Sequence, residues 1–126
     1  LQLRKKTPNI SDEEAIRRYL STQSSRYFDI LYNRYINKVY SKCISLLKNE
    51  ALAQDAAQEI FLKIFLNLAK FNHKSRFSTW VYSISYNYCI DFLRKQKKKQ
   101  RIFVAEKENM PDIQEEVSGN FYTRRL

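Results

Sequence analysis

Hydrophobic residues recur along this chain at intervals of three and four, which is the spacing of one face of an α-helix. The clearest stretch predicts a long amphipathic helix from Arg26 to about Lys48. Its apolar positions are Tyr27, Phe28, Leu31, Tyr32, Tyr35, Ile36, Val39, Tyr40, Cys43, Ile44 and Leu47. A shorter helix is expected before it, from Ser11 to about Leu20, because a serine followed by acidic residues is a typical helix start.

A third helix, from Ala51 to about Lys70, is apolar except along one narrow stripe. The stripe is formed by Asp55, Glu59, Lys63, Asn67 and Lys70, with Gln58 beside it. A helix this apolar is buried on most sides or meets a partner. Composition alone favours a central core helix over a partner interface.

A fourth helix is predicted from Arg76 or Phe77 to Lys99 or Gln100, with Ser75 as its cap. Its expected inward positions are Phe77, Trp80, Val81, Ile84, Tyr88, Ile90 and Leu93. For Phe77 and Tyr88 a core role is preferred. For Trp80 and Asn87 the pattern does not decide between core and binding surface.

Chain breakers are confined to the ends of the sequence, since the only glycine is Gly119 and the only prolines are Pro8 and Pro111. A β-rich fold would need more turn residues. We therefore predict an all-α fold, a compact bundle of about four helices at 11–101. Residues 1–10 are expected to be a flexible basic lead-in. Residues 102–126 are expected to be a disordered or extended acidic interdomain linker with a truncated C-terminus.

Charge points to a polyanionic partner, because 23 Lys and Arg face 13 Asp and Glu, a formal net charge of +10. Most of the excess lies between Lys70 and Arg101, where Asp91 is the only acidic residue. A basic protein without a nucleic-acid partner remains the plainer alternative. No apolar run is long enough to span a membrane, and the N-terminus does not resemble a secretion signal.

No catalytic constellation is found. A single glycine cannot build a phosphate-binding loop, and the single histidine, His73, has no evident partner. Cys43 and Cys89 are too far apart for a redox motif and are expected to be buried or half-buried, reduced thiols of a cytoplasmic protein. Asp55 and Glu59 share a helix face, but a solvated stripe is favoured over a metal site. We therefore expect neither an enzyme nor a metal or other cofactor.

The fourth helix carries aromatic and small polar side chains immediately before its basic run. Aromatic rings stack on unpaired bases, Asn and Ser donate to or accept from base edges, and Lys and Arg meet phosphates. This order of residue types suits single-stranded or opened DNA.

These residues also resemble a known family. The sequence Phe77-Ser-Thr-Trp-Val-Tyr-Ser-Ile-Ser-Tyr-Asn87, followed by Asp91, Leu93, Arg94 and Lys95, resembles a signature of bacterial sigma factors of the sigma-70 family, above all the extracytoplasmic-function (ECF) group. Ala53-Gln-Asp-Ala-Ala-Gln-Glu-Ile-Phe-Leu-Lys63 resembles the preceding family segment. The resemblance covers roughly residues 12 to 101.

The resemblance implies a region 2 domain, which joins RNA polymerase and recognises and melts the −10 promoter element. In the family the acidic stripe docks on the clamp helices of the polymerase β′ subunit. The resemblance therefore implies that Asp55, Gln58 and Glu59 are interface residues, with Phe61 and Phe65 as apolar anchors. On this basis the polar stripe of the third helix is a docking face, and the helix is no longer interpreted as a core element alone. The resemblance also admits an anti-sigma factor as a partner.

On the DNA side, the resemblance implies a loop that captures a base from the non-template strand, formed by Asn72, His73, Lys74, Ser75 and Arg76. The residues implied to face the strand are Thr79, Trp80, Ser83 and Asn87. Those implied to contact phosphates are Arg94, Lys95 and Lys98. The loop varies within the family, so the preferred base is not assigned.

A second hypothesis comes from a different class of protein. The apolar third helix and the charged end of the fourth also fit a helical protein–protein adaptor whose basic tail binds nucleic acid non-specifically.

Overall fold

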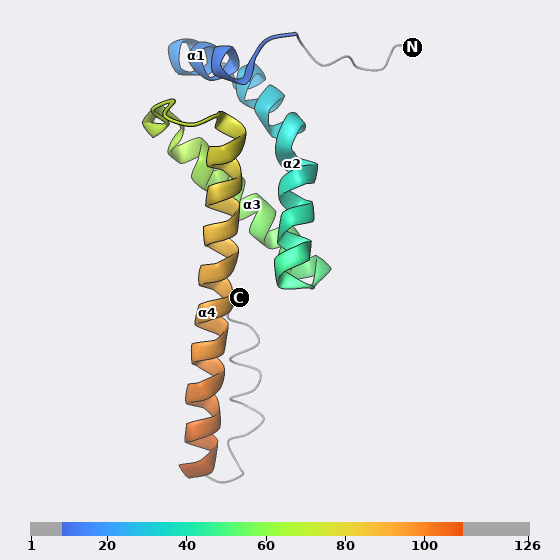
Figure 1. Ribbon diagram of the computed structural model, residues 1–126, viewed down its shortest axis with the longest axis vertical. Helices are drawn as coiled ribbons and strands as arrows, with labels where there is room; N and C mark the ends of the chain where they lie inside the picture. Colours follow the sequence, from blue (N-terminus) through green and yellow to red (C-terminus); the bar gives the residue numbers. More distant parts are fainter. Residues whose placement is uncertain (1–8, 110–126) are drawn as a thin grey trace.

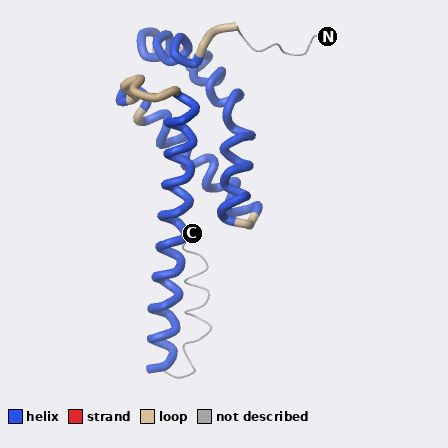
Figure 2. Tube along the Cα trace, in the orientation of Figure 1, coloured by secondary structure: helices blue, strands red, loops and turns tan. Residues whose placement is uncertain are grey.

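The computed structural model describes residues 9–109, which form four α-helices and one short 3-10 turn without any strand (Figures 1 and 2). The helices are α1 (Asp12–Thr22), α2 (Ser25–Leu47), α3 (Glu50–Leu66) and α4 (Phe77–Asn109), with η1 (Leu68–Lys70) between the last two. The prediction of an all-α bundle of about four helices is confirmed. Most of the predicted lead-in and of the predicted linker lies outside the described residues.

Side chains and left-handed residues fix the ends of the first three helices. The Ser11 hydroxyl accepts a hydrogen bond from the Glu14 amide at 3.0 Å, as the sequence predicted. Asn49 does the same for α3, accepting from the Leu52 amide at 2.8 Å. Gln23 and Lys48, with φ of 62° and 56°, close α1 and α2 in the left-handed conformation that often ends helices.

The third helix is shorter than predicted. It ends at Leu66, and residues 68–70 form the separate turn η1. The Asn67 side chain donates to the carbonyl of Lys63 at 2.8 Å, within the last turn of α3. Asn67 and Lys70 therefore do not continue the polar stripe of the helix.

The fourth helix is longer than predicted, since it continues past Gln100 to Asn109. The part of the predicted extended linker at 102–109 is thus helical. Ser75 was also wrongly predicted as the cap: its hydroxyl donates to the carbonyl of Arg76 at 3.3 Å. That same carbonyl accepts the first helical bond, from the Trp80 amide at 3.1 Å.

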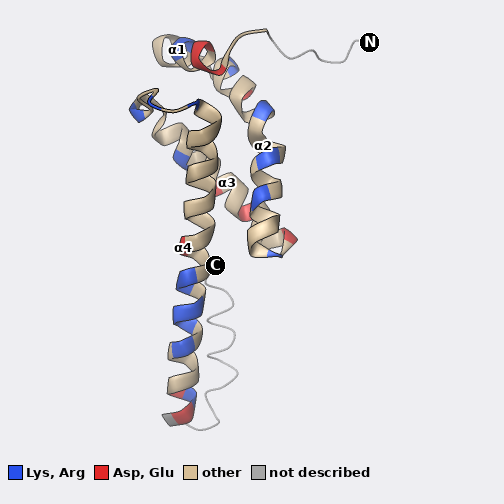
Figure 3. Cartoon of the chain, in the orientation of Figure 1, with Lys and Arg blue, Asp and Glu red and all other residues tan. Residues whose placement is uncertain are grey.

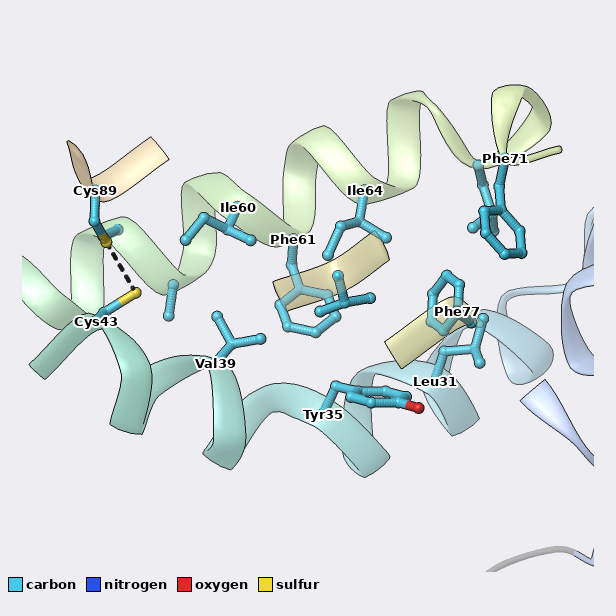
Figure 4. Close-up of a cluster of buried hydrophobic side chains, with 14 of the residues drawn as sticks. Leu31, Tyr35, Val39, Cys43, Ile60, Phe61, Ile64, Phe71, Phe77 and Cys89 are labelled. Carbon is cyan, nitrogen blue, oxygen red and sulfur yellow. Dashed lines mark hydrogen bonds between the residues drawn. The ribbon is translucent and has the colours of Figure 1, made fainter. Parts of the chain in front are cut away.

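The core lies where α2, α3 and α4 pack together (Figure 4). Phe77 and Val81 of α4 are fully buried, as predicted, and Trp80, Ile84 and Tyr88 pack partly exposed against the core. The prediction of which α4 residues point inward is wrong towards the middle of the helix. Leu93, predicted inward, is 36% exposed, whereas Ser85 and Cys89, which were not predicted inward, are fully buried. Small side chains at the crossing let the helices approach closely. The Ser85 hydroxyl is satisfied by donating to the Val81 carbonyl at 2.8 Å.

The two cysteines meet in this core. Cys43 of α2 and Cys89 of α4 are both free thiols, fully buried, with their sulfur atoms 3.7 Å apart (Figure 4). Burial, with Cys89 nearby, raises the pKa of Cys43 to about 12. The prediction of buried, reduced thiols is confirmed.

The first helix adds three buried residues to the core, Ala15, Ile16 and Tyr19. It is also tied to α2 through polar contacts. Arg34 donates to the Asp12 carboxylate at 2.8 Å and to the Ile10 carbonyl at 2.6 Å. The Tyr35 hydroxyl donates to the same carboxylate. Beyond the bundle, the C-terminal half of α4 extends well past the ends of α2 and α3 (Figure 1).

Candidate nucleic-acid interface

The outer face of α4 gathers most of the residues predicted to face DNA. Residues spaced by three, four or seven positions lie on one side of a helix. That side is opposite the core positions Phe77, Val81, Ser85 and Cys89. The outward set with this spacing is Trp80, Ser83, Asn87, Arg94 and Lys98, with Arg76 in line with them just before the helix. All are exposed except Trp80, which is half-buried, and the exposed Thr79 borders them.

The loop before α4 rests on an aromatic cluster. Phe71 is buried, and its ring centre lies 5.0 Å from Trp80, 5.5 Å from Phe77 and 4.6 Å from His73. Trp80 is therefore both an edge of the core and a surface residue.

Beyond Phe71 the loop turns sharply. His73 has a φ of 62°, and the Asn72 side chain accepts from the Lys74 amide at 3.1 Å. All five predicted loop residues, 72–76, are exposed. The loop thus exposes polar and basic groups on a turn that packs against the aromatic ring of Phe71.

A groove of about 350 Å³ runs between α3 and α4 beside this face. It brings Asn87 and Lys95, predicted for bases and phosphates, together with Lys63 of α3. The remaining lining residues are Ile84, Tyr88, Asp91 and Phe92. The sequence did not predict that Lys63 lies near Asn87. Its pattern places Lys63 four residues after Glu59 on another helix and does not show which α4 residues face it.

Tyr88 packs on the core, as predicted, and also lines this groove. Burial raises the pKa of Tyr88, with the nearby Glu59 and Asp55 carboxylates adding to the effect. Its hydroxyl therefore stays protonated at neutral pH and can donate a hydrogen bond.

Basic residues continue from the end of the groove along the part of α4 that leaves the bundle (Figure 3). Arg94, Lys95 and Lys98 are exposed there. Arg94 donates to the Asp91 carboxylate at 2.9 Å, but both side chains are largely solvated. Such a surface pair contributes only about 0–1 kcal/mol, so it does not hold Arg94 away from a phosphate.

The acidic stripe of α3 is a second exposed surface. Asp55, Gln58 and Glu59 are all exposed, and Gln58 donates to the Tyr32 hydroxyl at 3.1 Å. Of the two predicted apolar anchors, Phe65 is 39% exposed. Phe61 is only 3% exposed, because its ring packs against Tyr32 and Phe28 with ring centres 4.9 and 6.4 Å away. Phe61 is a core residue, and its prediction as a docking anchor was wrong.

Two leucines of α3 are exposed on the surface that carries the acidic stripe. Leu62 is 50% and Leu66 is 67% exposed. They follow Asp55 by seven and eleven positions, so they continue its face along the helix. The spacing could have found them from sequence, but their apolar character assigned them to the core.

Comparison with known proteins identifies the class of domain. The family model for sigma-70 region 2 matches residues 31–99, more than half of the 126-residue chain. The chain therefore belongs to the sigma-70 region 2 family.

Its relatives include ECF sigma factors. It is 41% identical over 63 residues to the ECF RNA polymerase sigma factor SigW of Bacillus subtilis (strain 168), covering 50% of this chain and 34% of that protein. It is 34% identical over 74 residues to SigM of the same organism, covering 59% and 45%. The aligned segment thus covers less than half the length of these relatives.

Membrane-spanning and metal-binding features are both absent from residues 9–109. No helix in this range is both long and apolar enough to cross a bilayer. The same residues contain no cluster of three or more His, Cys, Asp or Glu side chains placed to hold a metal ion.

Proposed function

We propose that this chain is the promoter-recognition domain of an ECF-type sigma factor. It binds core RNA polymerase and recognises and melts the −10 promoter element, with no catalytic activity of its own. The observation that carries the proposal is the outer face of α4. There, Trp80, Ser83 and Asn87 lie in line with Arg94 and Lys98, next to the exposed loop 72–76.

Each part of that face has a matching task. The loop and Trp80 offer hydrogen bonds and an aromatic surface to an extruded base, whose release from the stack costs a few kcal/mol. Ser83 and Asn87 reach base edges, with Thr79 beside them. Arg94, Lys95 and Lys98 meet phosphates and so contribute affinity without sequence preference.

The polymerase contact is assigned to the exposed face of α3. Asp55, Gln58 and Glu59 dock on the β′ clamp helices, and Phe65 with Leu62 and Leu66 provides apolar contact. A cytoplasmic site of action stays a prediction from the sequence, and an anti-sigma factor as a further partner stays a prediction from the family resemblance.

A selection experiment on strands of random sequence tests base reading. The chain is used to enrich single-stranded oligonucleotides from a pool with a randomised centre, and the affinity for the enriched strand is compared with that for its scrambled version. We expect a clear preference, reduced by about 1–3 kcal/mol in Asn87→Ala because a base-edge contact is lost. Swapping loop residues 72–75 is expected to change which base is preferred.

Asn33→Ala is the matched control, because Asn33 is an exposed amide on α2, outside the proposed interface. It should leave both affinities unchanged. If the chain binds enriched and scrambled strands equally, and neither Asn87→Ala nor the loop swap has an effect, the non-specific adaptor is the better explanation.

A further inference from the structure

A second groove, between α2 and α4, takes no part in the interface described so far. Its volume is about 540 Å³. Five of its lining residues come from exposed positions of α2 and the sixth, the half-buried Tyr82, comes from α4. The lining residues are Asn37, Lys38, Ser41, Lys42, Ser45 and Tyr82.

The chemistry of this groove suits a phosphate. Ammonium, hydroxyl and amide groups are the side-chain donors that most often contact phosphate oxygens. None of the six lining residues is acidic, and the ion pairs found within residues 9–109 do not involve Lys38 or Lys42. The two lysines are one helical turn apart, about 6 Å along the axis, so their charges add at the same place.

The groove is continuous with the outer face of α4. Tyr82 directly precedes Ser83 and lies about 100° round the helix from it. Tyr86, one turn further along, is exposed beside Asn87. Tyr82 itself is held by Tyr35 of α2, with ring centres 6.3 Å apart. A strand lying over Ser83 and Asn87 therefore reaches the α2 lysines by passing over tyrosine rings, without turning round the molecule.

We propose that this α2–α4 groove binds backbone phosphates of the same DNA that contacts the outer face of α4. Lys38 and Lys42 neutralise them, and Ser41, Ser45 and Asn37 donate hydrogen bonds to their oxygens. The inference rests on the proposed function and extends its DNA contact from α4 to a second helix, α2. An acidic protein surface is the other polyanion that fits, but continuity with the base-reading face favours DNA.

The test compares the salt dependence of binding between charge-removal variants of the 126-residue chain. The probe is a fluorescein-labelled DNA duplex with an unpaired bubble at its centre, and the readout is anisotropy at several salt concentrations. Each neutralised phosphate contributes about 0.9 to the slope of log affinity against log salt. Lys38→Gln/Lys42→Gln should therefore make the slope shallower by about 1.8.

Two matched variants isolate the effect. Lys48→Asn removes an exposed charge at the end of the same helix, outside the groove, and Asn tolerates the left-handed φ of 56° there. It should leave the slope nearly unchanged. Lys38→Arg/Lys42→Arg keeps both charges and should keep the slope. Since Gln and Lys have similar helix propensities, the double Gln variant should melt at the wild-type temperature.

An unchanged slope in the double Gln variant overturns the proposal and favours an acidic protein surface in the groove. A slope change of equal size in Lys48→Asn also overturns it, because the effect would then be one of net charge alone. The proposed function is judged separately, by the preference for the enriched strand. The double Gln variant should keep that preference, since phosphates carry no base identity.

Discussion

Phe61 and Leu62 are neighbours in α3 with opposite surroundings, one packed among aromatic rings and the other half exposed. Phe61→Ala should lower the free energy of unfolding by about 3–5 kcal/mol, because it removes a buried ring and leaves a cavity. Leu62→Ala, the matched control, should change it by less than about 0.5 kcal/mol. Urea unfolding followed by circular dichroism measures both. Similar losses in the two variants would contradict the packing described for α3.

The buried pair Cys43 and Cys89 predicts a dependence of stability on pH. Burial and the neighbouring thiol raise the pKa of Cys43 from its ordinary value near 9 to about 12. Above pH 9 the unfolded chain therefore loses this proton first, and unfolding becomes more favourable as pH rises. The stabilisation is complete below that pH and is lost as pH rises towards the folded-state value.

Thiol labelling checks the same residues independently. Because the thiolate is the reactive form, both cysteines should react slowly with an aromatic disulfide reagent at pH 8 and rapidly once urea unfolds the chain. Rapid labelling of the native chain would show that the α2–α4 contact opens readily.

The element scale is best seen in α4, whose two halves differ in what supports them. The first half packs on α2 and α3, whereas the second carries adjacent basic residues and leaves the bundle (Figure 1). Pairs such as Arg94 and Lys98 repel at helical spacing by about 0.2–0.5 kcal/mol. Amide hydrogens of residues 77–92 should therefore exchange slowly and those of 97–109 much faster.

Salt provides the control for that measurement. Raising it should slow exchange in the second half of α4, because repulsion is screened, and leave the first half unchanged. Equal protection along the whole helix would mean that the second half has a packing partner.

Helix existence was predictable from sequence because the apolar spacing of α1, α2 and the start of α4 is regular. The end of α4 was not predictable in this way, because a change in the sign of the charge is also typical of a linker. Glu, Lys and Ala are all good helix formers, so the helix passes through 105–108, and the first proline in its path is Pro111. Charge alone does not end a helix.

The residue types of the candidate site could be predicted from sequence, but the contacts between helices around it could not. Spacing along α4 placed Ser83 and Asn87 on one side together with Arg94. It could not bring Lys63 from α3 beside Asn87, nor Lys38 and Lys42 from α2 beside Tyr82, because those contacts depend on how helices cross. Small buried residues such as Ser85 decide that crossing, and their sequence signal is weak.

At the scale of the whole molecule, the acidic pair of α3 and the basic groups of α4 and α2 lie on different helices. The acidic residues Asp55 and Glu59 face outward from α3, while basic residues line the outer side of α4 and the exposed side of α2 (Figure 3). This arrangement allows one domain to meet a protein partner and a polyanion at once. It also means that the two contacts should respond independently to charge changes.

A pair of variants tests that independence. Asp55→Lys/Glu59→Lys should abolish capture of the chain by immobilised core RNA polymerase, because the docking charge is reversed. It should also leave DNA affinity equal or slightly higher, since net charge rises. Arg94→Gln/Lys98→Gln should do the opposite, lowering DNA affinity with a salt slope shallower by about 1.8 and leaving polymerase capture intact. If either variant impairs both contacts while melting at the wild-type temperature, polymerase and DNA share a surface, and the assignment of α3 to one and α4 to the other fails.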